Sequence, residues 1–203
     1  MRPFDQFPID VQKTLLALEE QDQKERINGH DISIRLRQIP RETGEFLYLF
    51  ISSLVNKQTF LGLEIGFSGG YSTIWQGIAL KMKKMGQLYS LDHDPKKFHL
   101  ASRNIALTEL IDYVKLFNVD AKSYIMKFNE KFDYVFLDAE KEEYLEFYNL
   151  LRNKTHSGTV LVADNVISNE EDVKDFLTAI HNDDQVTSII NPVGKGLAIV
   201  RWV

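Results

Sequence analysis

Acidic residues lie at the ends of three successive β-rich segments of the sequence, and a glycine-rich turn, 66–73, follows the first of these segments. The acids are Glu64, Asp92 and Asp120. Asp92 follows Gly70 at the spacing of about 20 residues at which a strand-end acid accepts hydrogen bonds from both hydroxyls of a ribose. A phosphate would instead need a helix N-terminus free of carboxylates, usually with Lys or Arg nearby. The pattern therefore favours an adenosine without phosphates, as in S-adenosylmethionine, over NAD or ATP.

The same turn permits other interpretations. Residues 66–70 satisfy G-x-S-x-G, the pattern of a serine hydrolase, in which His156 or His181 would be the base by chain order alone. Only helix-like sequence precedes the first strand, however, and neither histidine is well placed. As a dinucleotide fingerprint the turn fits poorly, because Ser68 and Tyr71 occupy positions that require glycine. A turn with a purely structural role is the remaining alternative.

Polar side chains also follow the fourth and fifth β-rich segments. Asp138 follows one, and Asp164 and Asn165 follow the other. If the two strands are neighbours, their ends lie about 4.8 Å apart, and the three side chains offer oxygens to one point. Oxygen ligands without His or Cys suit Mg²⁺ or a similar divalent cation. Alternatively, each side chain caps the helix that follows it.

Lys141 stands three residues after Asp138, at the predicted start of the next helix. A cation in the first turn opposes the helix dipole, which indicates that this lysine has a function. The alternative is an exposed lysine within an acidic run that includes Glu140, Glu142 and Glu143.

The elements that must position these residues alternate along the chain. Strands are predicted at Thr59 to Ile65, Gln87 to Leu91, Tyr113 to Phe117, Tyr134 to Leu137 and Thr159 to Ala163. Helices are predicted at Ser72 to Lys83, Pro95 to Leu107, Ala121 to Phe128, Lys141 to Arg152 and Glu170 to His181. Such alternation predicts an α/β, Rossmann-like, doubly wound and mostly parallel sheet.

Both ends of the chain add to this core. Val11, Leu15 and Leu18 recur at helical spacing up to a stop at 28–29, and a second helix is predicted over 42–55. Two strand-like runs, 186–190 and 197–202, predict an antiparallel pair at the C-terminal edge of the sheet. We therefore expect a single domain, 1–203, with a helical extension over 1–56 and a core over 57–203.

Composition excludes several classes of protein. The 203 residues include no Cys and carry a formal net charge of −5, which argues against a disulfide scaffold and a duplex-binding surface. The longest apolar run, 46–51, is far shorter than the roughly 18 residues of a membrane span. With no secretory signal visible, we expect a cytoplasmic protein that binds neither nucleic acid nor membrane.

Taken together, the segments resemble class I S-adenosylmethionine-dependent O-methyltransferases of the catechol and caffeoyl-CoA type. The resemblance rests on residues 39–49, 61–75, 90–95, 119–121, 132–148, 158–166 and 194–202. It implies that the cofactor contacts Glu64, Gly66, Ser68, Ser72, Asp92, His93, Asp120, Ala121 and Asp138. It also implies that Asp138, Asp164 and Asn165 are the metal ligands and that Lys141 is the catalytic lysine.

The resemblance implies a metal-assisted methyl transfer to a hydroxyl of a small, catechol-like acceptor. The acceptor stays open, because Ile189 and its neighbours occupy the region where catechol enzymes carry an acidic residue. Apolar residues of the N-terminal helices could roof the acceptor pocket or form the face of a homodimer. Two further alternatives are a degenerate cofactor-binding interaction module and a nucleic-acid methyltransferase. The latter usually carries N-P-P-aromatic after strand four, where this chain has 138–141.

Overall fold

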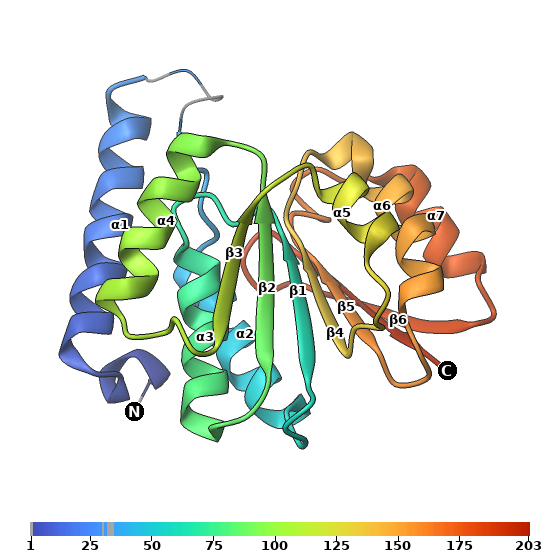
Figure 1. Cartoon of the computed structure of the whole chain (residues 1–203). Coiled ribbons are helices and arrows are strands. Elements are labelled where there is room, and N and C mark those ends of the chain that lie inside the picture. The colour runs from blue at the N-terminus through green and yellow to red at the C-terminus, as the bar shows by residue number, and fades with distance from the viewer. Residues whose placement is uncertain (1, 30, 32–34) are drawn as a thin grey trace.

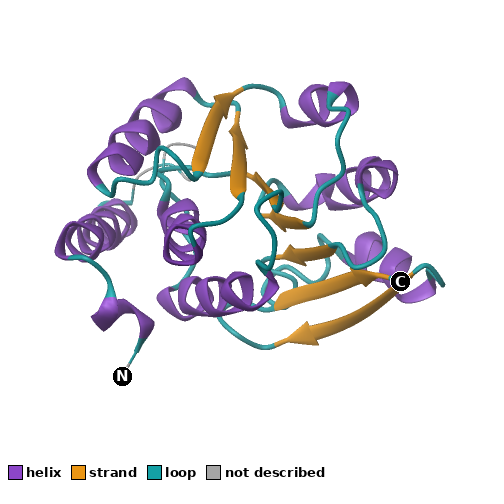
Figure 2. Cartoon of the chain, turned by 60° about the horizontal axis from the view of Figure 1, so that its bottom comes forward, coloured by secondary structure: helices purple, strands orange, loops and turns teal. Residues whose placement is uncertain are grey.

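A seven-stranded β-sheet forms the centre of the structure, a computed structural model that describes residues 2–29, 31 and 35–203. The strands are β1 (Leu61–Ile65), β2 (Gln87–Asp92), β3 (Val114–Asn118), β4 (Tyr134–Leu137), β5 (Val160–Ala163), β6 (Val186–Asn191) and β7 (Leu197–Trp202). Their order in the sheet is β3-β2-β1-β4-β5-β7-β6. The strands form one twisted layer with helices on both sides (Figure 2).

All strands except β7 run in the same direction. β7 lies between β5 and β6 and pairs antiparallel with both. The Rossmann-like fold and its antiparallel C-terminal strand are therefore confirmed. β2 and β4 pair with β1 on its two opposite sides, so the strand order reverses between β1 and β4. At such a reversal a crevice opens at the carboxyl ends of the strands.

Seven α-helices of the described residues cover the sheet. They are α1 (Ile9–Ile27), α2 (Arg41–Leu54), α3 (Tyr71–Lys83), α4 (Pro95–Leu107), α5 (Ala121–Lys127), α6 (Tyr144–Leu151) and α7 (Lys174–Asn182). α1 to α4 lie toward one face and α5 to α7 toward the other (Figure 1). A separate apolar core fills the space on each side, with Trp75 in one and Phe176 in the other, both fully buried. The two cores hold the carboxyl ends of the strands in register.

Two predicted helix boundaries are wrong. The helix expected from Glu170 begins at Lys174, because residues 165–173 form turns closed by backbone hydrogen bonds, such as Asn169 N–H to Asn165 O at 2.9 Å. The helix expected over 141–152 begins with a 3₁₀ turn, η2 (Lys141–Glu143), and ends at Leu151 before a second such turn, η3 (Arg152–Lys154). The remaining predicted helices and strands agree with the structure to within two residues at each end.

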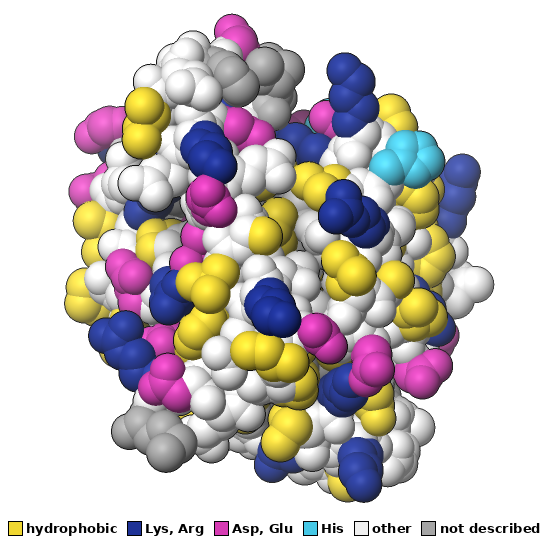
Figure 3. All heavy atoms as spheres, turned by 90° about the vertical axis from the view of Figure 1, so that its left-hand side faces the viewer, with side chains coloured by type: hydrophobic (Ala, Val, Ile, Leu, Met, Phe, Trp, Pro, Cys, Tyr) yellow, Lys and Arg dark blue, Asp and Glu magenta, His cyan; other side chains and the backbone are white. Residues whose placement is uncertain are grey.

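The N-terminal extension begins with a 3₁₀ turn, η1 (Pro3–Gln6), and packs against the core through α1 and α2. The outer face of the extension carries charged and apolar side chains intermixed in small groups (Figure 3). Ile9 and Leu16 are among its exposed apolar residues, Leu107 of the neighbouring α4 is also exposed, and a groove of about 520 Å³ lies between α1 and α4. No helix among the described residues has the length and apolarity needed to cross a bilayer.

Candidate active site

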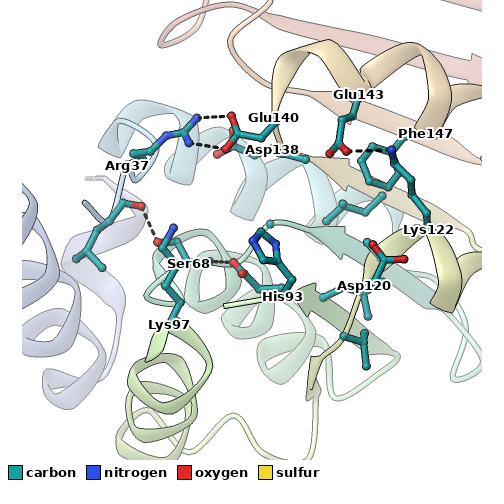
Figure 4. A pocket seen from close by; sticks show the side chains of 18 residues that line it. Arg37, Ser68, His93, Lys97, Asp120, Lys122, Asp138, Glu140, Glu143 and Phe147 are labelled. Carbon is teal, nitrogen blue, oxygen red and sulfur yellow. Dashed lines mark hydrogen bonds and ion pairs between the residues drawn. The ribbon is translucent and has the colours of Figure 1, made fainter. Parts of the chain in front are cut away.

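A cavity of about 390 Å³ lies at the carboxyl ends of β1, β2 and β4. Figure 4 shows polar side chains from several elements pointing into it. Among the residues proposed from sequence for the cofactor, those that line the cavity are Gly66, Ser68, Asp92, His93, Asp120, Ala121 and Asp138. Chain segments far apart in the sequence thus meet at the crevice where an α/β sheet of this order binds ligands.

Gly66 lets the first turn pass directly over the end of β4. Its φ is +91°, and a Cβ built on it would lie 2.2 Å from the carbonyl oxygen of Asp138. Gly70 also has a positive φ, +87°, and it is the N-cap of α3. Glycine is required at 66 for both reasons, because a side chain is disfavoured at positive φ and has no room.

Asp92, at the end of β2, holds the turn from the other side. Its Oδ2 accepts the backbone N–H of Ser68 at 2.9 Å, and its Oδ1 accepts that of Asp94 at 2.9 Å. Each carboxylate oxygen retains a further acceptor position, so hydroxyls of a bound ribose can share them. The Ser68 hydroxyl donates to the carbonyl of Leu36 at 2.6 Å, which ties the turn to the N-terminal extension.

The residues of the serine hydrolase alternative are not brought together. The Ser68 hydroxyl is bonded to a backbone carbonyl, and His156 contacts Asp133 at 2.9 Å instead. His181 lies in the last turn of α7, on the other face of the sheet from α3. This arrangement does not support a nucleophilic serine.

Asp120 lines the cavity and also caps α5. Its Oδ1 accepts the N–H of Ser123 at 2.8 Å, and hydrogen bonding to Ser123 lowers the pKa of this carboxyl. Asp120 therefore stays ionised, which suits a hydrogen-bond acceptor at the cavity wall. Lys122 also points toward the cavity and pairs with Glu143 at 2.9 Å, as Figure 4 shows.

Glu64 and Ser72 lie beneath the turn rather than on the cavity wall. Glu64 is fully buried and accepts hydrogen bonds from the Ser72 hydroxyl at 2.6 Å, the Thr73 hydroxyl at 2.6 Å and Gln76 Nε2 at 2.7 Å. Burial raises the pKa of Glu64 to about 7, although the Ser72 and Thr73 hydroxyls act against the shift. In this structure Glu64 and Ser72 join β1 to the first turn of α3.

The three residues proposed as metal ligands lie at the ends of adjacent strands. β4 and β5 pair with Leu137 opposite Ala163, so Asp138 and Asp164 are neighbours, and Asn165 follows. Asn165 has a φ of +66°, in the left-handed region that asparagine tolerates better than most residues. Neither carboxylate caps an adjoining helix, because the N-caps of η2 and α7 are Glu140 and Val173.

Asp164 is buried, and its carboxylate is incompletely hydrogen-bonded. Its side chain is 1% exposed, and within the described residues its Oδ1 has no hydrogen-bond donor. Burial, together with the negative charge of Asp138, raises the pKa of Asp164 to about 7. A divalent cation would both occupy the unpartnered oxygen and neutralise the pair, so the residues present fit such an ion.

The donor set is two carboxylates and one amide. In the part of the chain that the structure describes, no three His, Cys, Asp or Glu side chains gather closely enough to form a metal centre by themselves. A cation at Asp138, Asp164 and Asn165 would therefore complete its coordination with water or with oxygens of a substrate. Mg²⁺ commonly binds proteins in this way.

Lys141 is held directly beside this group and is only 8% exposed. Its Nζ donates to Asp138 Oδ1 at 2.8 Å, to the carbonyl of Ala139 at 2.9 Å and to the hydroxyl of Tyr144 at 2.9 Å. The Tyr144 hydroxyl in turn contacts the carbonyls of Leu137 and Asp164, both at 3.1 Å. Lys141 is thus a buried, oriented amine and not an exposed member of the acidic run.

Sequence reasoning missed Tyr144 and the ion pair between Arg37 and Glu140. Tyr144 lies three residues after Lys141, which places both on one side of a helical turn, so this spacing was a usable signal. Arg37 contacts Glu140 at 2.6 Å across the mouth of the cavity, as Figure 4 shows. No local signal connects these two residues, since 103 positions separate them.

Comparison with known proteins identifies the family of this chain. A profile of the O-methyltransferase family matches residues 18–203, so the chain belongs to that family. It is 36% identical over 128 residues to a catechol O-methyltransferase of Niastella koreensis, a match that covers 61% of this chain and 56% of that protein. It is 30% identical over 130 residues to a catechol O-methyltransferase of Mycobacterium tuberculosis, covering 64% and 57%.

The matches therefore span little more than half the length of these two relatives. The fold is shared more widely. The SAH-bound structure of a methyltransferase from Podospora anserina superposes with a TM-score of 0.81 at 16% identity, over 97% of this chain and 89% of that one. The predicted family and the predicted fold are both confirmed.

Proposed function

We propose that this protein transfers the methyl group of S-adenosylmethionine to a hydroxyl of a small aromatic acceptor with two adjacent hydroxyls. One observation carries the proposal. Asp138 lines the cofactor cavity and at the same time belongs to the group formed by Asp164, Asn165 and Lys141. A methyl donor in the cavity would therefore lie next to the site at which an acceptor oxygen is held.

Different residues of the cavity would bind different parts of the cofactor. Asp92 would accept the ribose hydroxyls, the turn at Gly66 and Ser68 would face the methionine part, and His93 and Asp120 would flank the adenine. The acids on the wall suit a sulfonium cation and do not suit a phosphate. Family membership and the SAH-bound neighbour support this assignment.

Asp138, Asp164 and Asn165 would hold a divalent cation, in our proposal Mg²⁺. When bound, such an ion lowers the pKa of a coordinated hydroxyl and orients two adjacent oxygens. The unpartnered oxygen of buried Asp164 supports this part of the proposal. The names of the two catechol O-methyltransferase relatives support a catechol-like acceptor.

Lys141, acting as a neutral amine, would take the proton from the acceptor hydroxyl at its Nζ and become an ammonium. A new bond then forms between the acceptor oxygen and the methyl carbon, the sulfur–carbon bond breaks, and S-adenosylhomocysteine leaves with the electron pair on sulfur. Tyr144 and Asp138 fix the position of Nζ through the hydrogen bonds described above. Holding both reactants in line can contribute about 7–11 kcal/mol to lowering the barrier.

A transfer assay with labelled methyl donor and vicinal dihydroxy aromatics, with Mg²⁺ or with chelator, tests the proposal. We expect Mg²⁺-dependent formation of a methyl ether, and its loss in Asp138→Ala. Asp175→Ala, which removes an exposed carboxylate on α7, is the matched control and keeps full turnover. Full activity of Asp138→Ala in chelator would refute the metal assignment. Cofactor binding without any transfer would favour the interaction-module alternative.

A further inference from the structure

A second hollow, of about 280 Å³, lies between the N-terminal extension and the loop that joins β6 to β7. Its walls come from α1, from residues 38–41, from the start of α3 and from the loop between β6 and β7, which contributes Lys195. The Lys195 carbonyl accepts the N–H groups of Ile167 and Ser168, at 3.1 and 3.0 Å, just after Asn165. The loop that contributes Lys195 to the hollow is thus bound to the segment that directly follows Asn165.

Most charges in the hollow are neutralised within it. Arg41 forms an ion pair with Glu19, which also accepts the Tyr71 hydroxyl at 2.5 Å. Arg26 pairs with Asp22 at 2.6 Å. These two ion pairs leave no net charge among the four ionised side chains.

Lys195 is the exception. It is half-buried, and among the residues that the structure describes no carboxylate lies within ion-pair distance of its Nζ. The backbone hydrogen bonds from Ile167 and Ser168 to the Lys195 carbonyl place this lysine on the loop next to the segment that carries Asn165. A partly buried cation without a direct partner is costly, and an anionic ligand would remove that cost.

Gln38 adds a second unmet polar group to the same hollow. Its Oε1 is buried and has no hydrogen-bond donor within the described chain. Rotation of the amide by half a turn exchanges oxygen and NH₂, which would present a donor at this position. An ammonium and an amide NH₂ that line the same hollow can together bind the two oxygens of a carboxylate.

We propose that Lys195 selects acceptors that carry a carboxylate on the aromatic ring, and that this hollow holds the carboxylate while the ring hydroxyls lie at Asp138 and Asp164. This inference rests on the proposed function and specifies its substrate class. Lys195 is then a specificity-determining residue that contacts the substrate and takes no part in the proton transfer.

The test compares 3,4-dihydroxybenzoate with 3,4-dihydroxybenzamide, which differ in charge but hardly in shape. We expect the wild type to prefer the acid by about tenfold or more in kcat/KM, because a hydrogen bond to a charged group contributes enough free energy for a preference of that size. Lys195→Met should abolish that preference by lowering kcat/KM for the acid alone, whereas Lys195→Arg should retain most of the preference. Lys174→Met, at an exposed lysine on α7, is the control and leaves the ratio unchanged.

Binding to the complex with S-adenosylhomocysteine and Mg²⁺, measured by calorimetry, gives a readout that does not depend on turnover. The affinity for the acid should fall in Lys195→Met and weaken with added salt, while the affinity for the amide stays constant. Equal losses for acid and amide would overturn the inference, because Lys195 would then act through Asp164. A wild type that methylates both equally would refute the inference and leave the proposed function intact, whereas transfer to neither acceptor would count against both.

Discussion

Replacing Gly66 with alanine tests whether the turn that begins at Gly66 and the backbone of Asp138 hold each other in position. The new Cβ would lie 2.2 Å from the carbonyl oxygen of Asp138 and 2.9 Å from its carbonyl carbon. These are backbone atoms at the end of a buried strand, so they cannot move aside as a flexible side chain would. We therefore expect the substitution to displace both the turn and Asp138.

The expected loss of unfolding free energy in Gly66→Ala has two parts. A residue with a side chain pays about 1–2 kcal/mol for a left-handed backbone such as the φ of +91° at Gly66. Forcing an extra methyl into a packed region adds about 1–3 kcal/mol. Gly158→Ala is the matched control, because its φ is +95° but its nearest neighbour, Arg201 Nη2, lies 3.9 Å away. Gly158→Ala should therefore show only the first part.

Urea denaturation measures both costs, and calorimetry with S-adenosylhomocysteine measures their effect on binding. Gly158→Ala should lose about 1–2 kcal/mol of unfolding free energy and bind the ligand normally. Gly66→Ala should lose about 2–5 kcal/mol and bind at least about tenfold more weakly. Equal destabilisation of the two variants with normal ligand binding by Gly66→Ala would refute the reasoning.

Three further predictions concern the ionisable groups. Burial raises the pKa of Glu64 to about 7 in the folded chain, above its ordinary 4.5, so the stability present below pH 4.5 is lost as pH rises through 7. Relative to Glu64→Gln, wild type should lose about 3 kcal/mol of unfolding free energy between pH 4.5 and 8 in urea titrations, and a constant difference would contradict this. Lys141→Met should lower kcat by about 10²–10⁴-fold with little change in S-adenosylhomocysteine affinity, and an unchanged pH–rate profile would remove Lys141 from the base role. Asp164→Asn should raise the melting temperature of metal-free protein at pH 8, because a buried charge is removed, and should abolish any stabilisation by Mg²⁺; a melting temperature that still rises with Mg²⁺ would place the ion elsewhere.

Local sequence patterns predicted the strands well. The run 134–137 agrees with β4 at both ends, because four consecutive apolar residues between polar ones read clearly as a buried strand. The start of α7 was missed because residues 165–173 combine helix-like composition with turns that depend on bonds to the β6–β7 loop, such as Ile167 N–H to Lys195 O. Tertiary contacts of this kind leave no periodic signal.

The site was predictable where strand ends alone determine it. Asp92 and Asp138 line the cavity because each lies at or just past the end of its strand, as sequence position indicated. Glu64 lies one residue before the end of β1, so it projects to the face covered by α3 rather than past the end of the strand. The ion pair of Arg37 with Glu140 joins segments whose approach only the complete fold determines.

A crystal structure with S-adenosylhomocysteine, Mg²⁺ and a vicinal dihydroxy aromatic tests the central claim most directly. We predict that the ribose hydroxyls bind Asp92, that the ion binds Asp138, Asp164 and Asn165, and that one acceptor oxygen lies between Lys141 Nζ and the sulfur. The ligand in another cavity, or the two aspartates turned away from a common ion, would contradict the account.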